Sequence, residues 1–326
     1  MSRKIDMSKE EKEQTHFTTL IQVARLYYEE NLGQQEIANK LGVSRSLIAQ
    51  YLQKAREQDI VHIEINDPVG NCRQLSEEIR KIGRLNHVEV VSQAHNSPQL
   101  TLRAVATKAS QYLKNVMKTT DVFGISSGRS VTEVLDTLAL ESHRHFDNID
   151  VVPLLGENNN RAVYTQVNQL VLKTVNTLGG KPHFLFAPMM VGTPELRNAL
   201  LQEEYMKRIA ELWDRLTVIC VGIGVVPPTP GMIPYIGEEY IPDMIKSGAV
   251  GDICGRYFDS TGKIIESGVE DRVIGVSTDQ LHAIRNVVAI AHGSDKAHAV
   301  CGAIRTGIVT SLFIDRACAN IVAKEL

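Results

Sequence analysis

One short segment, GISSGRSVTEVL at 124–135, holds residue types that bind anions. Small hydroxyl residues and a glycine follow an apolar run, and helical spacing resumes at Val131. Backbone N–H groups at a helix start favour a bound anion, and serine hydroxyls and an arginine add further donors. The segment is not a Walker P-loop, because the spacing and the Gly-Lys-Ser/Thr ending are missing. It predicts a phosphate site formed by Ser126, Ser127, Gly128, Arg129 and Ser130.

The same segment also fits a different chemistry, since Gly124, Ser126 and Gly128 match the G-x-S-x-G pattern of a nucleophile elbow. A serine hydrolase then needs an acid and a histidine later in the chain. That order is available in Asp252 or Asp259 followed by His292. Matches of this kind are common at strand-to-helix turns, so a tight turn that binds no ligand stays open as well.

Other polar loops follow apolar runs. The run LLGENNN offers Gly156, Glu157 and several amides that suit sugar hydroxyls. The run VGIG at 221–224 ends with two glycines, but the third glycine of a dinucleotide fingerprint is missing. Asp252 suits a diol, and Lys296 near a helix start is placed to reach a phosphate. Tight turns, a surface salt bridge and a solvated lysine explain these features equally well.

The elements that position these loops alternate between helices and apolar strands after residue 72, the signature of a parallel sheet. Strands are expected at 88–92, 121–125, 149–155, 183–187, 217–223, 286–291 and 311–314. Helices are expected at 73–83, 98–117, 130–140, 162–178, 195–212, 278–284 and 295–307. The Gly- and Pro-rich region 225–275 is expected to hold antiparallel strands around GDICGRYFDSTGKII. Ligands of open α/β sheets bind outside the carboxyl ends of the strands, where the polar loops above lie.

The first 66 residues have a different pattern. A polar stretch at 1–15, expected to be disordered, precedes helical spacing at 17–31, 34–41 and 45–58. Gly42 suits the left-handed residue that ends a helix, and Ser44 suits the N-cap of the next one. An alternating run, IVHIEIN at 60–66, indicates a strand. Three helices and a terminal strand predict a winged helix-turn-helix.

The segment 40–56, which includes most of the third of these helices, carries an unusual charge pattern, with Lys40, Arg45, Lys54 and Arg56 and no acidic residue. In a helix-turn-helix the last helix enters the DNA major groove by its N-terminal end, and phosphate contacts fix its position. An ordinary solvated helix face is the alternative. The predicted DNA-binding residues are Ser44, Arg45, Ser46, Ala49, Gln50 and Lys54.

Bulk composition excludes several classes of protein. The 326 residues carry a formal net charge of −3 and are 43% hydrophobic, so a core is available and no global basic field is present. The five cysteines form no C-x-x-C pair, which favours reduced thiols in the cytoplasm and disfavours a metal site. No apolar run approaches 18 residues and no signal peptide is visible, so no membrane association is expected. No cofactor is expected either.

Taken together, the chain resembles the SorC-type sugar-responsive bacterial transcriptional regulators over essentially its whole length. The resemblance rests on LYYEENLGQQEIANKLGVSRSLIAQYLQKAREQDIVHIEI, VFGISSGRSV, LFAPMMVGTPELRNALL, VGIG, GDICGRYFD and HGSDKAHAVCGAIRTGIVTSLFID. It implies a DNA-binding domain at 1–66 and, at 67–326, an effector and oligomerisation domain related to phosphosugar isomerases and deaminases. It also implies dimers or tetramers on operator DNA.

Carried onto this sequence, the resemblance places Ser126, Gly128, Arg129 and Ser130 at a phosphate and adds Asp252 and Lys296 to the pocket. Two departures concern the ligand. Members commonly have an aromatic residue and often a threonine in the first loop, where this chain has Ser127 and Ser130, and a glycine-rich loop is replaced by Glu157 and asparagines. The hypothesis is a regulator controlled by a sugar or sugar phosphate. An isomerase-like or deaminase-like enzyme, with Glu157, Asp252 or His292 as general base, is the alternative besides the hydrolase.

Overall fold

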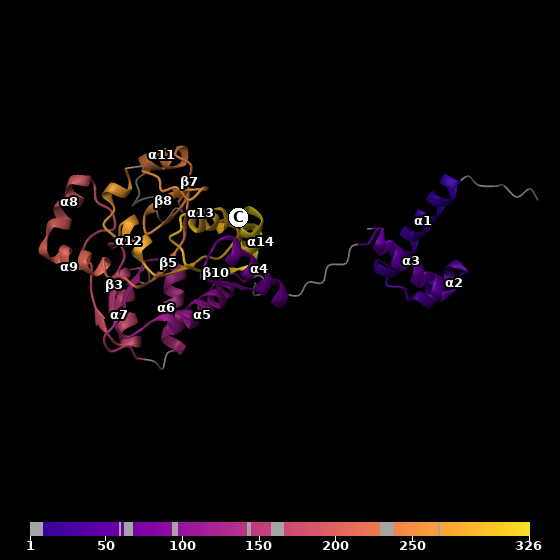
Figure 1. The fold of residues 1–326 in the computed structure, drawn as a ribbon, viewed down its shortest axis with the longest axis horizontal. Coiled ribbons are helices and arrows are strands. Elements are labelled where there is room, and N and C mark those ends of the chain that lie inside the picture. The colour runs from indigo at the N-terminus through magenta and orange to yellow at the C-terminus, as the bar shows by residue number, and fades with distance from the viewer. Residues whose placement is uncertain are drawn as a thin grey trace, which may run out of the picture. The chain divides into compact units, whose positions relative to one another are not determined.

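The computed structural model describes residues 9–58, 60–61, 68–92, 97–141, 145–157, 166–228, 238–266 and 268–326. The chain divides into two compact units, Met1–Asn66 and Asp67–Leu326, each of which is described by itself (Figure 1).

The N-terminal unit contains three helices, α1 Lys9–Tyr28, α2 Gln34–Leu41 and α3 Arg45–Glu57. Apolar side chains from all three are buried against one another, namely Val23, Leu26, Ile37, Ala38, Ile48 and Leu52. The expectation of disorder through residue 15 was wrong, because α1 begins at Lys9. Ile60 and Val61 pack against a second small core around Leu20 and Ala55. The rest of the predicted wing strand, at 62–66, lies outside the described residues.

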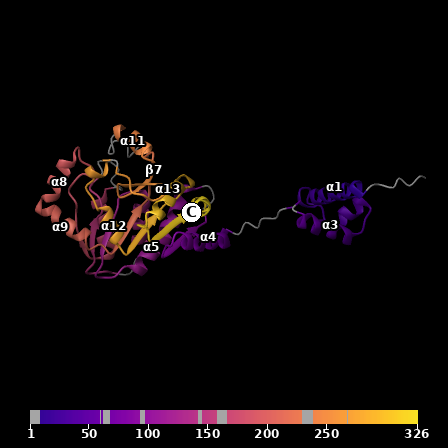
Figure 2. The ribbon, with the colours of Figure 1, turned by 45° about the horizontal axis from the view of Figure 1, so that its top comes forward.

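The C-terminal unit is built on a seven-stranded parallel sheet with the order β1-β10-β9-β5-β2-β3-β4. Its strands are β1 His87–Val91, β2 Val122–Ile125, β3 Asp150–Pro153, β4 Lys181–Pro182, β5 Val218–Gly222, β9 Asn286–Ile290 and β10 Ser311–Asp315. A second, antiparallel sheet contains β6 Gly224–Val225, β7 Ala249–Ile253 and β8 Arg256–Asp259. Figure 2 shows the strands of the main sheet side by side. The predicted α/β class and the antiparallel strands within 225–275 are confirmed.

Helices pack around both sheets of the C-terminal unit. They are α4 Pro68–Ile82, α5 Pro98–Val116, α6 Arg129–Glu141, α7 Val167–Leu178, α8 Pro194–Gln202, α9 Glu204–Trp213, α11 Ile241–Lys246, α12 Thr278–Ala283, α13 Ala297–Arg305 and α14 Arg316–Glu325. Short 3₁₀ helices are η2 Glu238–Tyr240, η3 Glu270–Arg272 and η4 Ser294–Lys296. In Figure 1, α5, α6 and α7 lie on one side of the strands, and α13 and α14 lie on the other.

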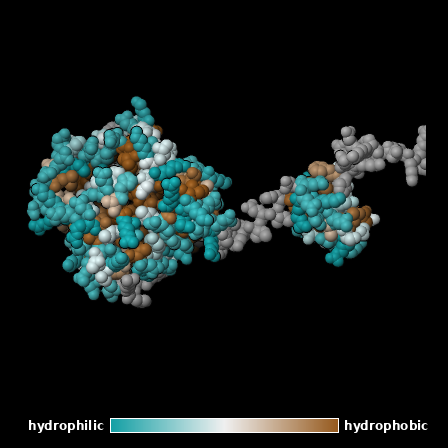
Figure 3. Space-filling view, in the orientation of Figure 1, coloured by the Kyte–Doolittle hydropathy of each residue, from teal (hydrophilic) through white to brown (hydrophobic). Residues whose placement is uncertain are grey.

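Strand residues alternate between two separate cores. Val218 and Cys220 on β5 belong to the core that includes α5, α6 and α7, whereas Ile219 and Val221 belong to the core that includes α4, α9, α13 and α14. Burial on both faces explains why these strands are continuous apolar runs. The large apolar side chains are mostly inside, and the visible face of the unit is largely hydrophilic with separate hydrophobic areas (Figure 3).

Several element predictions need correction. The run HFLFA at 183–187 forms no strand, because the backbone N–H and C=O of Leu185 bond the side chain of Asn168 on α7 at 2.9 and 3.1 Å. The expected helix at 195–212 is two helices divided at Glu203, whose backbone is extended. The helix expected from residue 73 begins at Pro68, whose fixed φ suits a first helical turn. The C-terminal helix α14 was not predicted.

Candidate effector and DNA-binding sites

The start of α3 has the geometry that the sequence predicts. Gly42 ends α2 in the left-handed conformation with a φ of 67°, and the Ser44 hydroxyl accepts from the Leu47 N–H at 3.2 Å. One face of α3 is buried at Ile48, Leu52 and Ala55. The opposite face is exposed, and it contains Arg45, Ser46, Ala49, Gln50 and Lys54. All six predicted DNA-binding residues therefore lie on solvent-accessible surface.

The positive charge of this segment is less isolated than the sequence suggests. Lys40 lies 3.8 Å from Glu30 of the loop after α1, with both side chains more than half exposed. Exposed pairs of this kind contribute little to stability. Within α3, Arg45, Lys54 and Arg56 are exposed, and the first turn contains no acidic residue.

In the C-terminal unit, the loop after β2 contains the predicted phosphate-binding residues. Ser126 is buried, and its N–H donates to the carbonyl of Cys220 on the neighbouring strand at 3.1 Å. Gly128 has a φ of +131°, a conformation that other residues adopt only with strain. α6 begins at the next residue, Arg129, without an acidic side chain in its first turn. The helix dipole and the exposed guanidinium of Arg129 together attract an anion at this edge of the sheet.

Three neighbouring strands, β9, β5 and β2, end at the same edge of the sheet. The loop after β9 contains His292 and leads into η4 with Lys296. The Lys296 ammonium donates to the carbonyl of Ile223, directly after β5. Burial lowers the pKa of both His292 and Lys296, and the positive charge of Arg129 lowers both further.

Asp252 joins this group from the second sheet. It pairs with Gly224 across β6 and β7, and its carboxylate accepts from the Gly255 N–H at 3.0 Å. Gly224 leaves room for it, because a Cβ at that position would lie 1.8 Å from an oxygen of Asp252. We call Arg129, Asp252, His292 and Lys296 the charge cluster.

Burial disfavours the charged forms of two groups in this cluster, Asp252 and Lys296. It raises the pKa of the Asp252 carboxyl, against the Gly255 N–H and Lys296, which lower it. It lowers the pKa of the Lys296 ammonium, which Asp252 and Asp295 raise and Arg129 lowers further. Perturbed, mutually facing groups of both signs are typical of a binding site. The arrangement offers two cations for a phosphate and a carboxylate for sugar hydroxyls.

Gly156 and Glu157 have a different setting from the one the sequence suggests. The two carboxylate oxygens of Glu157 accept from the N–H groups of Val167 and Asn168 at 3.2 and 3.0 Å, so this side chain bonds the start of α7. A Cβ on Gly156 would lie 2.4 Å from the carbonyl oxygen of Pro188, so only glycine fits there. The asparagines at 158–160 lie outside the described residues. An effector role for Gly156 and Glu157 stays a prediction.

Comparison with known proteins identifies the family of this chain. A family model described as "Putative sugar-binding domain" matches residues 67–324. The sorbitol operon regulator of Klebsiella pneumoniae is 26% identical over 308 residues, which cover 94% of this chain and 97% of that protein. The deoxyribonucleoside regulator of Bacillus subtilis is 26% identical over 309 residues, with the same coverage. The crystal structure of the full-length Klebsiella regulator SorC superimposes with a TM-score of 0.75 at 25% identity, covering 94% of this chain and 98% of that one.

The chain belongs to the SorC-type sugar-binding transcriptional regulators. The match to full-length SorC covers the helix-turn-helix region as well as the sheet, which agrees with the regulator architecture expected from the sequence. Among the residues that the structure describes, no helix is long and apolar enough to cross a membrane. Within the same residues, no group of three His, Cys, Asp or Glu side chains is arranged to hold a metal ion.

The serine hydrolase geometry is not assembled in this regulator. The Ser126 hydroxyl contacts the Ser127 carbonyl at 3.4 Å, and no hydrogen bond joins it to His292. Asp259 bonds Thr261 and Lys263 within the turn that follows β8. Among the described residues, Ser126, His292 and an acid form no hydrogen-bonded chain of the kind a triad uses.

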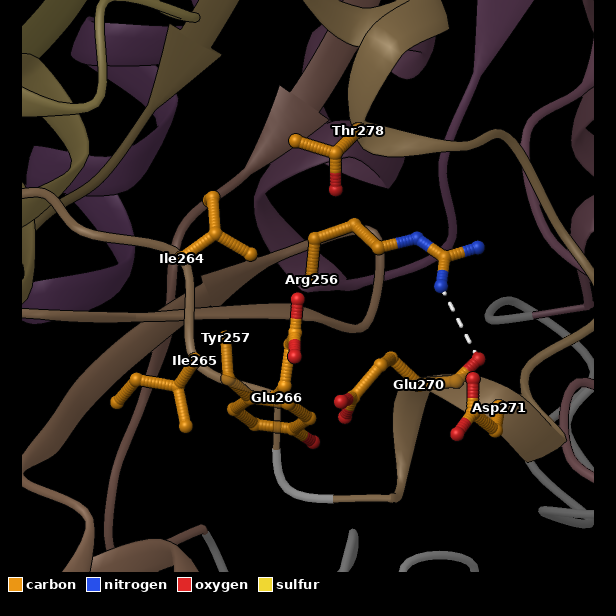
Figure 4. A pocket seen from close by; sticks show the side chains of 8 residues that line it. All are labelled: Arg256, Tyr257, Ile264, Ile265, Glu266, Glu270, Asp271 and Thr278. Atoms are coloured by element: carbon orange, nitrogen blue, oxygen red, sulfur yellow. Dashed lines mark hydrogen bonds between the residues drawn. The ribbon is translucent and has the colours of Figure 1, made fainter.

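The regulator also has a cavity that sequence reasoning missed. It has a volume of about 420 Å³ and is lined by Arg256, Tyr257, Ile264, Ile265, Glu266, Glu270, Asp271 and Thr278 (Figure 4). The buried Arg256 guanidinium donates to the carbonyls of Val276, Glu270 and Gly275 at 2.9, 3.1 and 3.3 Å. The arginine therefore holds loop backbone in place and is not a free cation for a ligand.

Asp315 is a second residue that sequence reasoning missed. It is fully buried at the end of β10 and accepts from the N–H groups of Ala317 and Cys318 at the start of α14 and from Gly293. It thereby ties the loop containing His292 to the neighbouring strand. An acidic residue directly after the apolar run SLFI was the available signal.

Proposed function

We propose that this chain is a DNA-binding regulator of a carbohydrate catabolic operon, controlled by a sugar or sugar phosphate bound at the charge cluster. The observation that carries the proposal is the convergence of Arg129, Asp252 and Lys296 on the edge where β2, β5 and β9 end. Two cations beside a helix start suit a phosphate, and the carboxylate suits hydroxyl groups. The sorbitol operon regulator among the relatives and the match to a sugar-binding domain support the same ligand class.

The N-terminal unit supplies the proposed DNA contact. The exposed residues at the start of α3, Arg45, Ser46, Ala49 and Gln50, are placed for base edges in the major groove. Lys54, one helical turn farther along, is placed for a phosphate. Operators of such proteins have paired half-sites, so we propose a homodimer or homotetramer acting in the cytoplasm.

The proposed regulation requires that the effector bind two arrangements of the protein with different affinity. An effector that binds one arrangement of the C-terminal units better than another shifts the population toward that arrangement. The shift alters the spacing of paired α3 helices, and half-sites on one face of DNA are sensitive to that spacing.

The first experiment is a thermal-shift screen of the purified protein. The panel contains hexitol, hexose, ketohexose and pentose phosphates, the free sugars and inorganic phosphate. A compound that binds the native state raises the melting temperature by mass action. We expect a sugar phosphate to raise it in the wild type and to lose most of its effect in Arg129→Ala.

The matched control is Arg208→Ala, which removes an exposed arginine on α9. It should respond to the panel as the wild type does. Specific operator binding without effector should be unchanged in Arg129→Ala and weakened in Arg45→Ala and Gln50→Ala. Equal calorimetric affinity of Arg129→Ala and wild type for the stabilising compound would exclude Arg129 from the site. Chemical conversion of that compound by the protein would instead favour an enzyme.

A further inference from the structure

We propose that His292 recognises a hydroxyl group of the effector next to its phosphate and thereby selects among sugar phosphates. The inference rests on the proposed function, since it names a selectivity residue for the same site.

The backbone fixes the position of His292. The preceding residue, Ala291, is buried and its N–H donates to the carbonyl of Phe313 at 3.1 Å. The following residue, Gly293, has a φ of +93° and donates its N–H to the buried carboxylate of Asp315. The imidazole therefore starts from a loop that is held on both sides, at the carboxyl end of β9.

The imidazole has no hydrogen-bond partner among the described residues, and its Nδ1 atom is fully enclosed. No hydrogen bond joins it to the nearby carboxylate of Asp315, which accepts from three backbone N–H groups. Buried polar nitrogens in native proteins are almost always paired, and exceptions need a functional or structural reason. Because Nδ1 is enclosed, the ring nitrogen available to a ligand is Nε2, on a side chain that is held in place beside two cations.

The surroundings determine which ligand group it bonds. Burial, Lys296 and Arg129 lower the pKa of His292, against Asp315 and Asp295, which raise it. A neutral imidazole has one donor and one acceptor nitrogen, which complements the O–H group of a sugar. The phosphate is better served by Arg129 and Lys296, which carry the positive charge. In this assignment, Arg129 and Lys296 bind the phosphate, and His292 binds a hydroxyl group.

The test is a cycle of matched ligands and matched variants, measured by calorimetry. Ligand pairs differ in one hydroxyl: ribose 5-phosphate with 2-deoxyribose 5-phosphate, glucose 6-phosphate with 2-deoxyglucose 6-phosphate, and fructose 6-phosphate with 1-deoxyfructose 6-phosphate. Inorganic phosphate is the baseline. Leucine and asparagine have nearly the same shape, so His292→Leu removes hydrogen-bonding capacity and His292→Asn retains it.

In the wild type, we expect at least one hydroxylated member to bind about tenfold more tightly than its deoxy partner, the ratio that one hydrogen bond supplies. His292→Leu should abolish that ratio and leave the affinity for inorganic phosphate unchanged, and His292→Asn should restore most of it. If leucine prevents folding, the asparagine variant compared with wild type over the same pairs decides the matter, since it should keep the preference for the same pair.

Three other outcomes would contradict the inference, and each would contradict a different part of it. Tight binding of a sugar phosphate by the wild type, with equal hydroxyl preference in His292→Leu, would refute the role of His292 and leave the proposed function standing. Binding of none of the sugar phosphates by the wild type would refute the proposed ligand class and the inference with it. Loss of inorganic phosphate binding in His292→Leu would assign the residue to the phosphate instead.

Discussion

Substitution of a single glycine should disable the charge cluster without changing any charged residue. A Cβ on Gly224 would lie 1.8 Å from Oδ1 of Asp252 and 2.8 Å from its Cγ, far inside the 3.4 Å at which ordinary contacts begin. The Asp252 carboxylate must move by more than 1 Å to admit the methyl group of Gly224→Ala. That movement breaks the hydrogen bond that the carboxylate accepts from the Gly255 N–H at 3.0 Å.

The magnitude follows from these two losses. Overpacking of a fitted site costs about 1–3 kcal/mol, and a lost hydrogen bond to a partly buried group costs about 1 kcal/mol more. We expect the free energy of unfolding of Gly224→Ala to fall by about 2–4 kcal/mol, measured by urea denaturation. Effector affinity should fall with it. The control is Gly222→Ala, since a Cβ at Gly222 meets no atom within 4 Å, and its unfolding free energy should change little.

A double variant tests the cause. Asp252→Ala removes the side chain that the new methyl group strikes, so Gly224→Ala should cost little stability in the Asp252→Ala background. Effects of the two substitutions on unfolding free energy should therefore be strongly non-additive. If the two effects on unfolding free energy simply add, Gly224 and Asp252 do not approach each other as closely as described. The pairing of β6 with β7 would then not be what places the carboxylate.

Three further outcomes follow from individual contacts. Lys54→Ala should weaken DNA binding uniformly across sequences and reduce the slope of log affinity against log salt by about one, as filter-binding titrations can measure. Glu157→Ala should lower the free energy of unfolding by about 1–2 kcal/mol through loss of the two bonds at the start of α7, and unchanged stability would contradict that role. Because burial raises the pKa of Asp252 above its ordinary 3.8, the fold loses stability from this group as pH rises from about 3.8 through the folded-state pKa. Asp252→Asn should lose less stability than the wild type over that interval, as urea titrations at several pH values would record.

Much of the architecture is predictable because its cause is local. Strands such as VICVG and NVVAI are buried on both faces, so each is a continuous apolar run that periodicity detects. Ser44 caps α3 through a contact three residues away, which the sequence also displays. The run HFLFA has the same composition as a strand, and what prevents one is a side chain on α7, Asn168. No local pattern contains that information.

Residues of the candidate site could be selected from the sequence one by one, but their proximity could not be predicted. The loop after β2 could be selected because it follows an apolar run, Asp252 because a carboxylate suits a diol, and Lys296 because it lies near a helix start. Their proximity depends on the pairing of β6 with β7 and on the bond from Lys296 to Ile223, both of which join distant segments. Glu157 has a residue type that suits a sugar, but its two carboxylate oxygens accept from N–H groups at the start of α7. No local pattern predicts that contact.

Under the proposed function, the position of Lys296 connects effector binding with regulation. Its ammonium bonds the carbonyl of Ile223, the residue between the end of β5 in the main sheet and the start of β6 in the second sheet. Asp252 faces Gly224 on the same connection. Under the proposed function, a phosphate that draws Lys296 toward itself competes with the Ile223 carbonyl, and sugar hydroxyls compete with the Gly255 N–H for Asp252. Both competitions act on the junction of the two sheets, so the effector binds two arrangements of that junction with different affinity. That difference is the thermodynamic requirement for a ligand-controlled switch.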